Sequence, residues 1–152
     1  MNNKILSAAC AFAITAACSA TVHAQAKPDV LVKQRQSAMA LQGKYFGPMA
    51  GMAQGKIPYD AGLVARNAGY LDVLAKMPWD GFTPNTKGEK TGALPAVFSE
   101  PAKFKEAADR LQTEATKLAQ VSRGGDEATV KAQILAVGKT CAACHDDYRE
   151  KR

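Results

Sequence analysis

Mostly apolar residues recur at alternating intervals of three and four along four stretches of the sequence. This spacing gathers side chains on one face of an α-helix. Helices of this kind bury their faces against one another, so the sequence predicts an all-α, antiparallel four-helix bundle in up-down-up-down order. The residues expected to face the core are Val32, Gln36, Met39, Gly43 and Phe46; Leu63, Asn67, Tyr70, Leu74 and Met77; Phe104, Ala108, Leu111, Ala115 and Leu118; and Val130, Ile134, Val137, Cys141, Cys144 and Tyr148.

Residues with known preferences for helix ends separate these stretches. The expected N-caps are Asp60, Ser99 and Asp126, because their side-chain oxygens can accept hydrogen bonds from the first backbone N–H groups of a helix. Pro78 is expected to end the second helix. Residues 78–100 then form a long connection, and a connection of this length in a small domain is commonly functional.

The first 24 residues have the composition of a secretory signal peptide. Lys4 gives a positive start, residues 5–20 are apolar and uncharged, and small residues follow. We expect cleavage after Ala24, with Ala26 as the alternative site, and one domain over residues 25–152. The apolar stretch is too short for a membrane span, so the expected location is the periplasm, without membrane insertion after processing.

The formal net charge is +6, but charges of opposite sign are interleaved along the chain. Dispersed charge is typical of a solvated surface, so no nucleic-acid partner is expected. The positive excess would favour docking to an acidic redox partner, which the sequence does not identify.

The segment 141–145, CAACH, contains both cysteines and the one histidine that remain after removal of residues 1–24. C-x-x-C-H is the sequence signature of covalent haem c attachment. Cys141 and Cys144 lie on the apolar face of the fourth helix, which directs both sulfur atoms into the bundle. We therefore predict one covalently bound haem c per chain, attached to Cys141 and Cys144, with His145 as an axial iron ligand.

Two other uses of this motif fit poorly. A thioredoxin-like dithiol lies at the start of a helix that follows a strand, whereas this motif lies late in a helix. A structural zinc site needs four ligands, usually nitrogen or sulfur, and no further Cys or His remains. A second iron ligand would have to precede the motif, because the seven residues after His145 contain no Met. The candidates are Met39, Met49, Met52 and Met77, or no residue at all.

With these features the sequence resembles the cytochrome c′ family, the class II c-type cytochromes, over essentially the whole mature chain. The C-terminal position of the haem motif and the pattern of the first helix make the resemblance specific. The residues that carry it are Arg35-Gln36-Ser37-Ala38-Met39, Tyr45-Phe46-Gly47-Pro48-Met49, Pro58-Tyr59-Asp60-Ala61, Leu74 with Met77-Pro78-Trp79, Phe82, and Cys141 to His145 with Asp146, Tyr148 and Arg149.

The resemblance implies a four-helix bundle, commonly a homodimer, with a five-coordinate, high-spin iron. His145 would be the sole protein ligand. The opposite face of the haem would be a closed apolar pocket that admits small uncharged gases such as NO and CO and disfavours anions.

The resemblance also implies roles for individual residues. Arg35 and Gln36 match positions that contact the haem propionates, although both also fit a solvated helix surface. Met39 would project over the open face of the haem, where it also serves as ordinary core packing. Phe82 would wall the haem from the long connection or simply anchor that segment. Arg149 would flank the histidine side of the haem, or be one of several terminal charges.

These expectations define an exported gas-binding haem protein that can also transfer electrons. The alternative is a low-spin class II electron-transfer cytochrome in which Met39 is the sixth iron ligand. An enzyme such as a haem peroxidase is not expected, because the one histidine is already used and no carboxylate lies on the face of the first helix. The family also contacts the haem near residues 90–92, where this sequence has an extra residue or two, so that contact stays unassigned.

Overall fold

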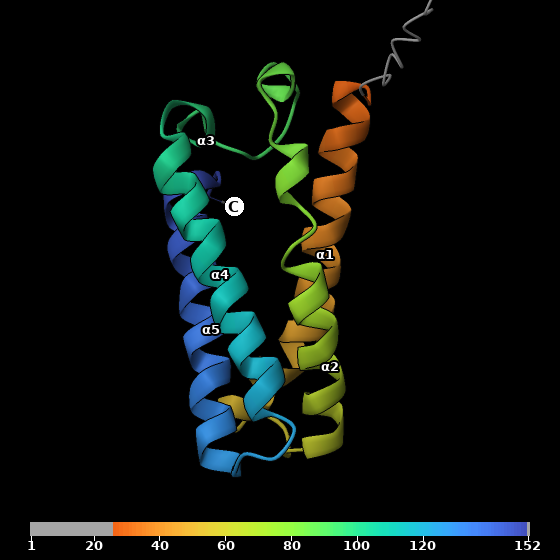
Figure 1. Cartoon of the computed structure of the whole chain (residues 1–152), viewed down its shortest axis with the longest axis vertical. Helices are drawn as coiled ribbons and strands as arrows, with labels where there is room; N and C mark the ends of the chain where they lie inside the picture. The colour runs from red at the N-terminus through yellow and green to blue at the C-terminus, as the bar shows by residue number, and fades with distance from the viewer. Residues whose placement is uncertain (1–25, 152) are drawn as a thin grey trace, which may run out of the picture.

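Four long helices form an antiparallel bundle in the computed structural model, which describes residues 26–151 (Figure 1). They are α1 (Pro28–Ala53), α2 (Ala61–Leu74), α4 (Pro101–Val121) and α5 (Glu127–Tyr148). Successive long helices run in opposite directions, with α1 and α2 on one side of the view and α4 and α5 on the other. The predicted all-α four-helix bundle is confirmed, and the predicted signal peptide lies outside the described residues.

Two of the predicted N-caps are confirmed by hydrogen bonds. Asp60 accepts from the backbone N–H of Leu63 at 2.9 Å, and Asp126 accepts from that of Thr129 at 2.9 Å. Each bond satisfies a backbone donor that has no partner inside its helix. These caps fix the starts of α2 and α5.

The predicted cap Ser99 is wrong. A one-turn helix, α3 (Ala96–Ser99), precedes α4 and already includes this residue, whose backbone N–H donates to Pro95 O at 3.1 Å. A helical residue cannot take the extended conformation of a cap. The N-cap of α4 is Glu100, which makes no side-chain capping bond.

The core faces of α4 and α5 agree with the predicted spacing, whereas the face predicted for α2 is only partly right, because Asn67 and Leu74 are buried as expected but Tyr70 and Met77 are not. Tyr70 and Met77 are 47% and 53% exposed, while Val64, Ala68 and Leu71 on the neighbouring face are buried. Tyr70 is followed directly by another apolar residue, so intervals of three and four fit two adjacent faces. Because α2 packs against both α1 and α4, the face between those two helices is the one that becomes buried.

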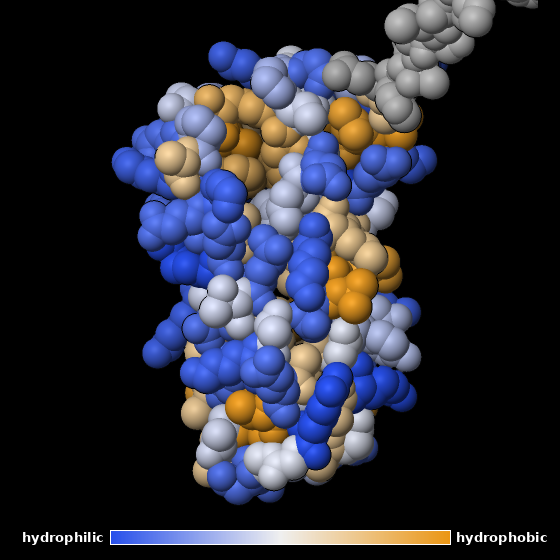
Figure 2. Space-filling model, in the orientation of Figure 1, coloured by the Kyte–Doolittle hydropathy of each residue, from blue (hydrophilic) through white to orange (hydrophobic). Residues whose placement is uncertain are grey.

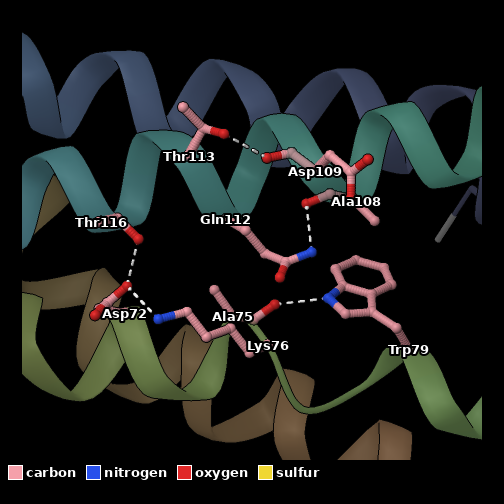
Figure 3. Close-up of polar contacts among 9 residues, drawn as sticks. All are labelled: Asp72, Ala75, Lys76, Trp79, Ala108, Asp109, Gln112, Thr113 and Thr116. Carbon is pink, nitrogen blue, oxygen red and sulfur yellow. Dashed lines mark hydrogen bonds and ion pairs between the residues drawn. The ribbon is translucent and has the colours of Figure 1, made fainter.

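Polar side chains join α2 to α4 along the edge of the core (Figure 3). The hydroxyl of Thr116 on α4 donates to Asp72 Oδ1 on α2 at 2.6 Å, and Lys76 Nζ lies 3.0 Å from the same oxygen. Burial alone would raise the pKa of Asp72, but the bonds from Thr116 and Lys76 outweigh it, and the net effect lowers the pKa. Beyond the end of α2, the indole N–H of Trp79 donates to Ala75 O at 2.7 Å.

The connection between α2 and α4 crosses one end of the bundle, beside the start of α1 and the end of α5 (Figure 1). It contains two short 3-10 helices, η1 (Trp79–Gly81) and η2 (Pro84–Thr86), followed by α3. Its later part pairs with the end of α5: Leu94 N donates to Tyr148 O at 3.0 Å, and Glu150 N donates to Gly92 O at 2.9 Å. The connection is therefore fastened to the helix that carries C-x-x-C-H.

Hydrophilic residues cover most of the surface in Figure 2, with smaller groups of apolar residues between them. This agrees with the dispersed charge of the sequence. Within residues 26–151, no helix combines the length and apolar character needed to cross a membrane.

Candidate haem-binding site

A cavity of about 730 Å³ lies among α1, α2, α4, α5 and the 75–100 connection. Its volume is within the range of about 300 to 1,000 Å³ that is common for ligand and cofactor sites. Residues far apart in the sequence meet in its wall. Every residue predicted to hold or contact a haem lines it: Arg35, Gln36, Met39, Phe82, Cys141, Cys144, His145 and Arg149.

The C-x-x-C-H side chains come from the last turns of α5. Burial raises the pKa of the Cys141 thiol to about 11, and burial also raises the pKa of Cys144. A redox-active C-x-x-C pair instead lowers the pKa of its nucleophilic thiol. The surroundings of these cysteines therefore suit apolar contacts better than dithiol chemistry.

Arg35 is the buried cation of the cavity wall, with only 2% of its surface exposed. Nη1 donates to Gly81 O at 2.7 Å and to Thr86 Oγ1 at 3.0 Å, and Nη2 donates to Thr91 Oγ1 at 3.4 Å. The guanidinium also lies over the ring of Phe82, 4.2 Å from its centroid. Burial lowers the pKa of Arg35, and none of the ion pairs among residues 26–151 includes it.

Aromatic side chains form one wall of the cavity and contact one another. The ring of Phe104 lies 4.9 Å from that of Phe82 and 5.1 Å from that of Tyr148, both edge-on. Trp79 packs edge-on against Phe104 at 5.8 Å. Pairs with this geometry stabilise a fold beyond their buried area, so they hold the connection against α4 and α5.

Most of the predicted inner face of α1 lines this cavity, whereas Val32 lies outside the cavity wall and is buried. Gln36, Met39, Gly43 and Phe46 all belong to the cavity wall. Apolar residues of α2, α3 and α4 complete it: Leu71, Val97 and Leu111.

Sequence reasoning missed several residues of the site. Thr91, Gly92 and Ala93 line the cavity from the connection, where no residue was assigned. Gln42 also lines it, and its amide donates to Leu74 O at 2.9 Å. No periodic pattern marks these positions. Glu150 brings a carboxylate to the cavity from the segment after α5, although none lies on the inner face of α1.

The residues present fit a haem. The cavity has the size of a cofactor site, its walls are largely apolar and aromatic, and two thiols and an imidazole reach it from α5. A buried guanidinium without an acidic partner suits a cofactor that bears carboxylates.

Known proteins of one family resemble this chain in sequence and in fold. The family model of cytochrome c′ matches residues 30–149. Cytochrome c′ of Rubrivivax gelatinosus is 43% identical over 126 residues, covering 82% of this chain and 98% of that protein. The fold resembles a nitric oxide complex of a mutant cytochrome c prime from Alcaligenes xylosoxidans, with a TM-score of 0.76, 38% identity, and coverage of 84% and 98%. A carbon monoxide-bound variant from the same organism has a TM-score of 0.75 and 39% identity, and the match covers 83% of this chain and 98% of that chain.

A helical bundle that brings a C-x-x-C-H motif to an apolar cavity defines a c-type haem protein. The match to the family model and the identity to curated relatives narrow the class further. The chain belongs to the cytochrome c′ family.

Proposed function

We propose that the mature chain is an exported haem protein with one haem c, covalently attached to Cys141 and Cys144 and ligated by His145. It reversibly binds NO and CO and can pass electrons to a redox partner. One observation carries the proposal: the C-x-x-C-H side chains of α5 share a single cavity with Arg35 and Met39 of α1. When bound, the haem supplies an iron centre with one coordination position left for a small gas.

The residues of α1 would orient the cofactor. Arg35 offers a buried positive charge to the haem carboxylates, and Gln36 beside it offers an amide. Burying a cation without an anion is costly, so a carboxylate against Arg35 would offset a cost that its neutral hydrogen-bond acceptors compensate only in part.

The apolar side chains around Met39 would select the gas. Phe46 and Leu71 line the same cavity and offer neither a charge nor a hydrogen-bond donor. A neutral diatomic molecule can enter such surroundings without losing strong hydration, whereas an anion cannot. The bulk of Met39 would oppose any ligand on its side of the cavity and favour the smallest.

Haem attachment is tested by expressing the whole chain in a Gram-negative host that attaches haem c. We expect periplasmic protein that begins at Gln25 and whose mass exceeds that of the polypeptide by one haem. Replacing both Cys141 and Cys144 with Ala should abolish the mass increase due to covalently attached haem while leaving export intact. A wild-type protein with the mass of the bare polypeptide would refute the proposal.

Gas binding is tested by stopped-flow absorbance of the reduced protein mixed with NO or with CO. Met39→Ala should raise the CO association rate at least tenfold, because it removes the bulk that opposes the ligand. Met77→Ala is the matched control, since Met77 is 53% exposed and lies outside the cavity wall. A reduced wild-type protein that binds neither gas would contradict the proposal.

Met39 lines the cavity under both the five-coordinate and the low-spin hypothesis, and absorbance spectra separate the two. If Met39 ligates the iron, the oxidised protein shows the weak long-wavelength band of an iron–thioether bond, and Met39→Leu removes that band. If the iron is five-coordinate, Met39→Leu leaves a high-spin spectrum in place. The spectra of the wild type and of Met39→Leu therefore decide whether the protein binds gases or only transfers electrons.

We also propose a homodimer, formed with a second copy of this chain through the exposed apolar face of α2. Tyr70 and Val73 are 47% and 53% exposed on α2, and Met77, just beyond the end of the helix, is 53% exposed. Sedimentation should show a dimer that Val73→Glu converts to monomer. Leu135→Glu, at a residue 43% exposed on α5, should leave the dimer intact, and a monomeric wild type would refute the proposal.

A further inference from the structure

A hydroxyl outside the cavity holds the cavity's buried cation in place. Thr86, the last residue of η2, is 0% exposed and does not line the cavity. Its Oγ1 accepts from Arg35 Nη1 at 3.0 Å and donates to Thr83 O at 2.8 Å. We propose that Thr86 is a positioning residue, which fixes the Arg35 guanidinium toward the haem and so sets the electrostatic effect of that cation.

Hydrogen-bond accounting supports a single orientation of Arg35. A guanidinium has five N–H groups and no acceptor. Both N–H groups of Nη1 are used by the connection, one on Gly81 O at 2.7 Å and one on Thr86 Oγ1. Nη2 donates one N–H to Thr91 Oγ1 at 3.4 Å. The N–H of Nε and the second N–H of Nη2 are then left for an anionic group in the cavity. Without the Thr86 hydroxyl, one N–H of Nη1 loses its acceptor, and the guanidinium is held less tightly, by Gly81 O, Thr91 Oγ1 and the Phe82 ring alone.

Thr86 is itself held rigidly, so it can act as a fixed acceptor. Its backbone N–H donates to Thr83 O at 2.9 Å, and its own carbonyl accepts from Glu89 N at 3.2 Å. Because the hydroxyl donates its one hydrogen to Thr83 O, it can only accept from Arg35. If the hydroxyl is removed, Thr83 O still accepts a hydrogen bond from the backbone N–H of Thr86. The group that loses its partner is therefore the guanidinium of Arg35.

The inference deepens the proposed function and rests on it where the haem is concerned. A fixed positive charge beside a redox centre favours the reduced state, because the reduced centre carries one positive charge fewer. Thr86 therefore raises the reduction potential through Arg35. A threonine that only packs the connection would have no such effect.

Four variants test this assignment in the haem-loaded protein. Thr86→Val removes the hydroxyl at nearly constant shape, and Thr86→Ser restores it. Thr83→Val is the matched control, since the exposed Thr83 hydroxyl bonds only to Asn85 Oδ1. Arg35→Leu removes the cation, and combining it with Thr86→Val completes a double-mutant cycle.

We expect Thr86→Val to lower the reduction potential, and Thr86→Ser and Thr83→Val to leave it near the wild-type value. In the Arg35→Leu background, Thr86→Val should lower it no further. A potential unchanged by Thr86→Val, or lowered equally in both backgrounds, would overturn the assignment.

The same cycle measured by urea unfolding gives a readout independent of the haem. We expect the two substitutions to be coupled by about tenfold in the unfolding equilibrium constant, as for a hydrogen bond to a charged group. Additive effects on unfolding would overturn the assignment. A wild-type chain that attaches no haem would refute the proposed function alone, because the unfolding cycle would still test Thr86.

Discussion

Gly81 packs closely against α1, and adding one methyl group there tests how the cavity wall is held. A Cβ at this position would lie 2.8 Å from Leu31 O and 2.9 Å from Arg35 Cβ, distances that real Cβ atoms do not adopt. The first neighbour is backbone of α1, which cannot move locally. Gly81→Ala must therefore push η1 away from α1.

Two costs follow from this displacement. Overpacking against a rigid neighbour costs about 1 to 3 kcal/mol. Weakening the 2.7 Å bond from Arg35 to Gly81 O removes a charge-assisted hydrogen bond, worth roughly 1.5 to 3 kcal/mol. The two share one movement and do not add fully, so we expect the free energy of unfolding to fall by about 2 to 4 kcal/mol.

Urea unfolding of the haem-loaded protein measures this loss, which corresponds to a midpoint lower by about 1 to 2 M at unchanged slope. Gly88→Ala is the control in the same connection, because a Cβ at Gly88 meets nothing within 4 Å and its φ is not positive. It should leave stability unchanged or slightly higher. Equal midpoints for Gly81→Ala and Gly88→Ala would refute the reasoning.

Three further predictions concern the bundle. Thr116→Val should lower the free energy of unfolding by about 1 to 2 kcal/mol in urea at pH 7. Because folding lowers the pKa of Asp72, the contribution of this bond is present above the unfolded pKa of Asp72, about 4, and is lost as pH falls through the lower folded pKa. A destabilisation by Thr116→Val that is undiminished at pH 2 would contradict this prediction. Gly125→Ala should lower the melting temperature, since its Cβ would lie 2.6 Å from a carbonyl oxygen of α4, whereas Gly124→Ala meets nothing within 4 Å and should not. Gly55→Ala should cost about 1 kcal/mol in urea unfolding because φ is +70° there, and an unchanged midpoint would contradict this.

Sequence reasoning succeeded where one local rule decides the outcome. The caps Asp60 and Asp126 follow from side-chain chemistry within a single helix turn. The face of α5 that carries Cys141 and Cys144 follows from a single period that runs from Val130 to Tyr148. The bundle and the elements that meet at the cavity could therefore be predicted without coordinates.

Sequence reasoning failed where partners distant in the chain decide the outcome. The roles of Gly81 and Thr86 depend on Arg35, which lies 46 and 51 residues away and which no spacing rule connects to them. The pairing of Gly92 with Glu150 is equally non-local. On α2, the choice between two adjacent apolar faces depends on the placement of α1 and α4. Each failure involves a contact between elements rather than the element itself.

The inner face of α1 shows how a regular period can also mark a cavity. Its intervals of three and four predict core packing, yet Gln36 and Gly43 are unusual core residues, one because its amide needs hydrogen bonds and the other because it leaves space unfilled. Both line the cavity, and the packed part of α1 lies instead at residues such as Ala38 and Met49. A polar and a very small residue within an otherwise apolar helical period are therefore a signal for a cofactor wall. Here they lie on the face that also presents Met39 to the cavity.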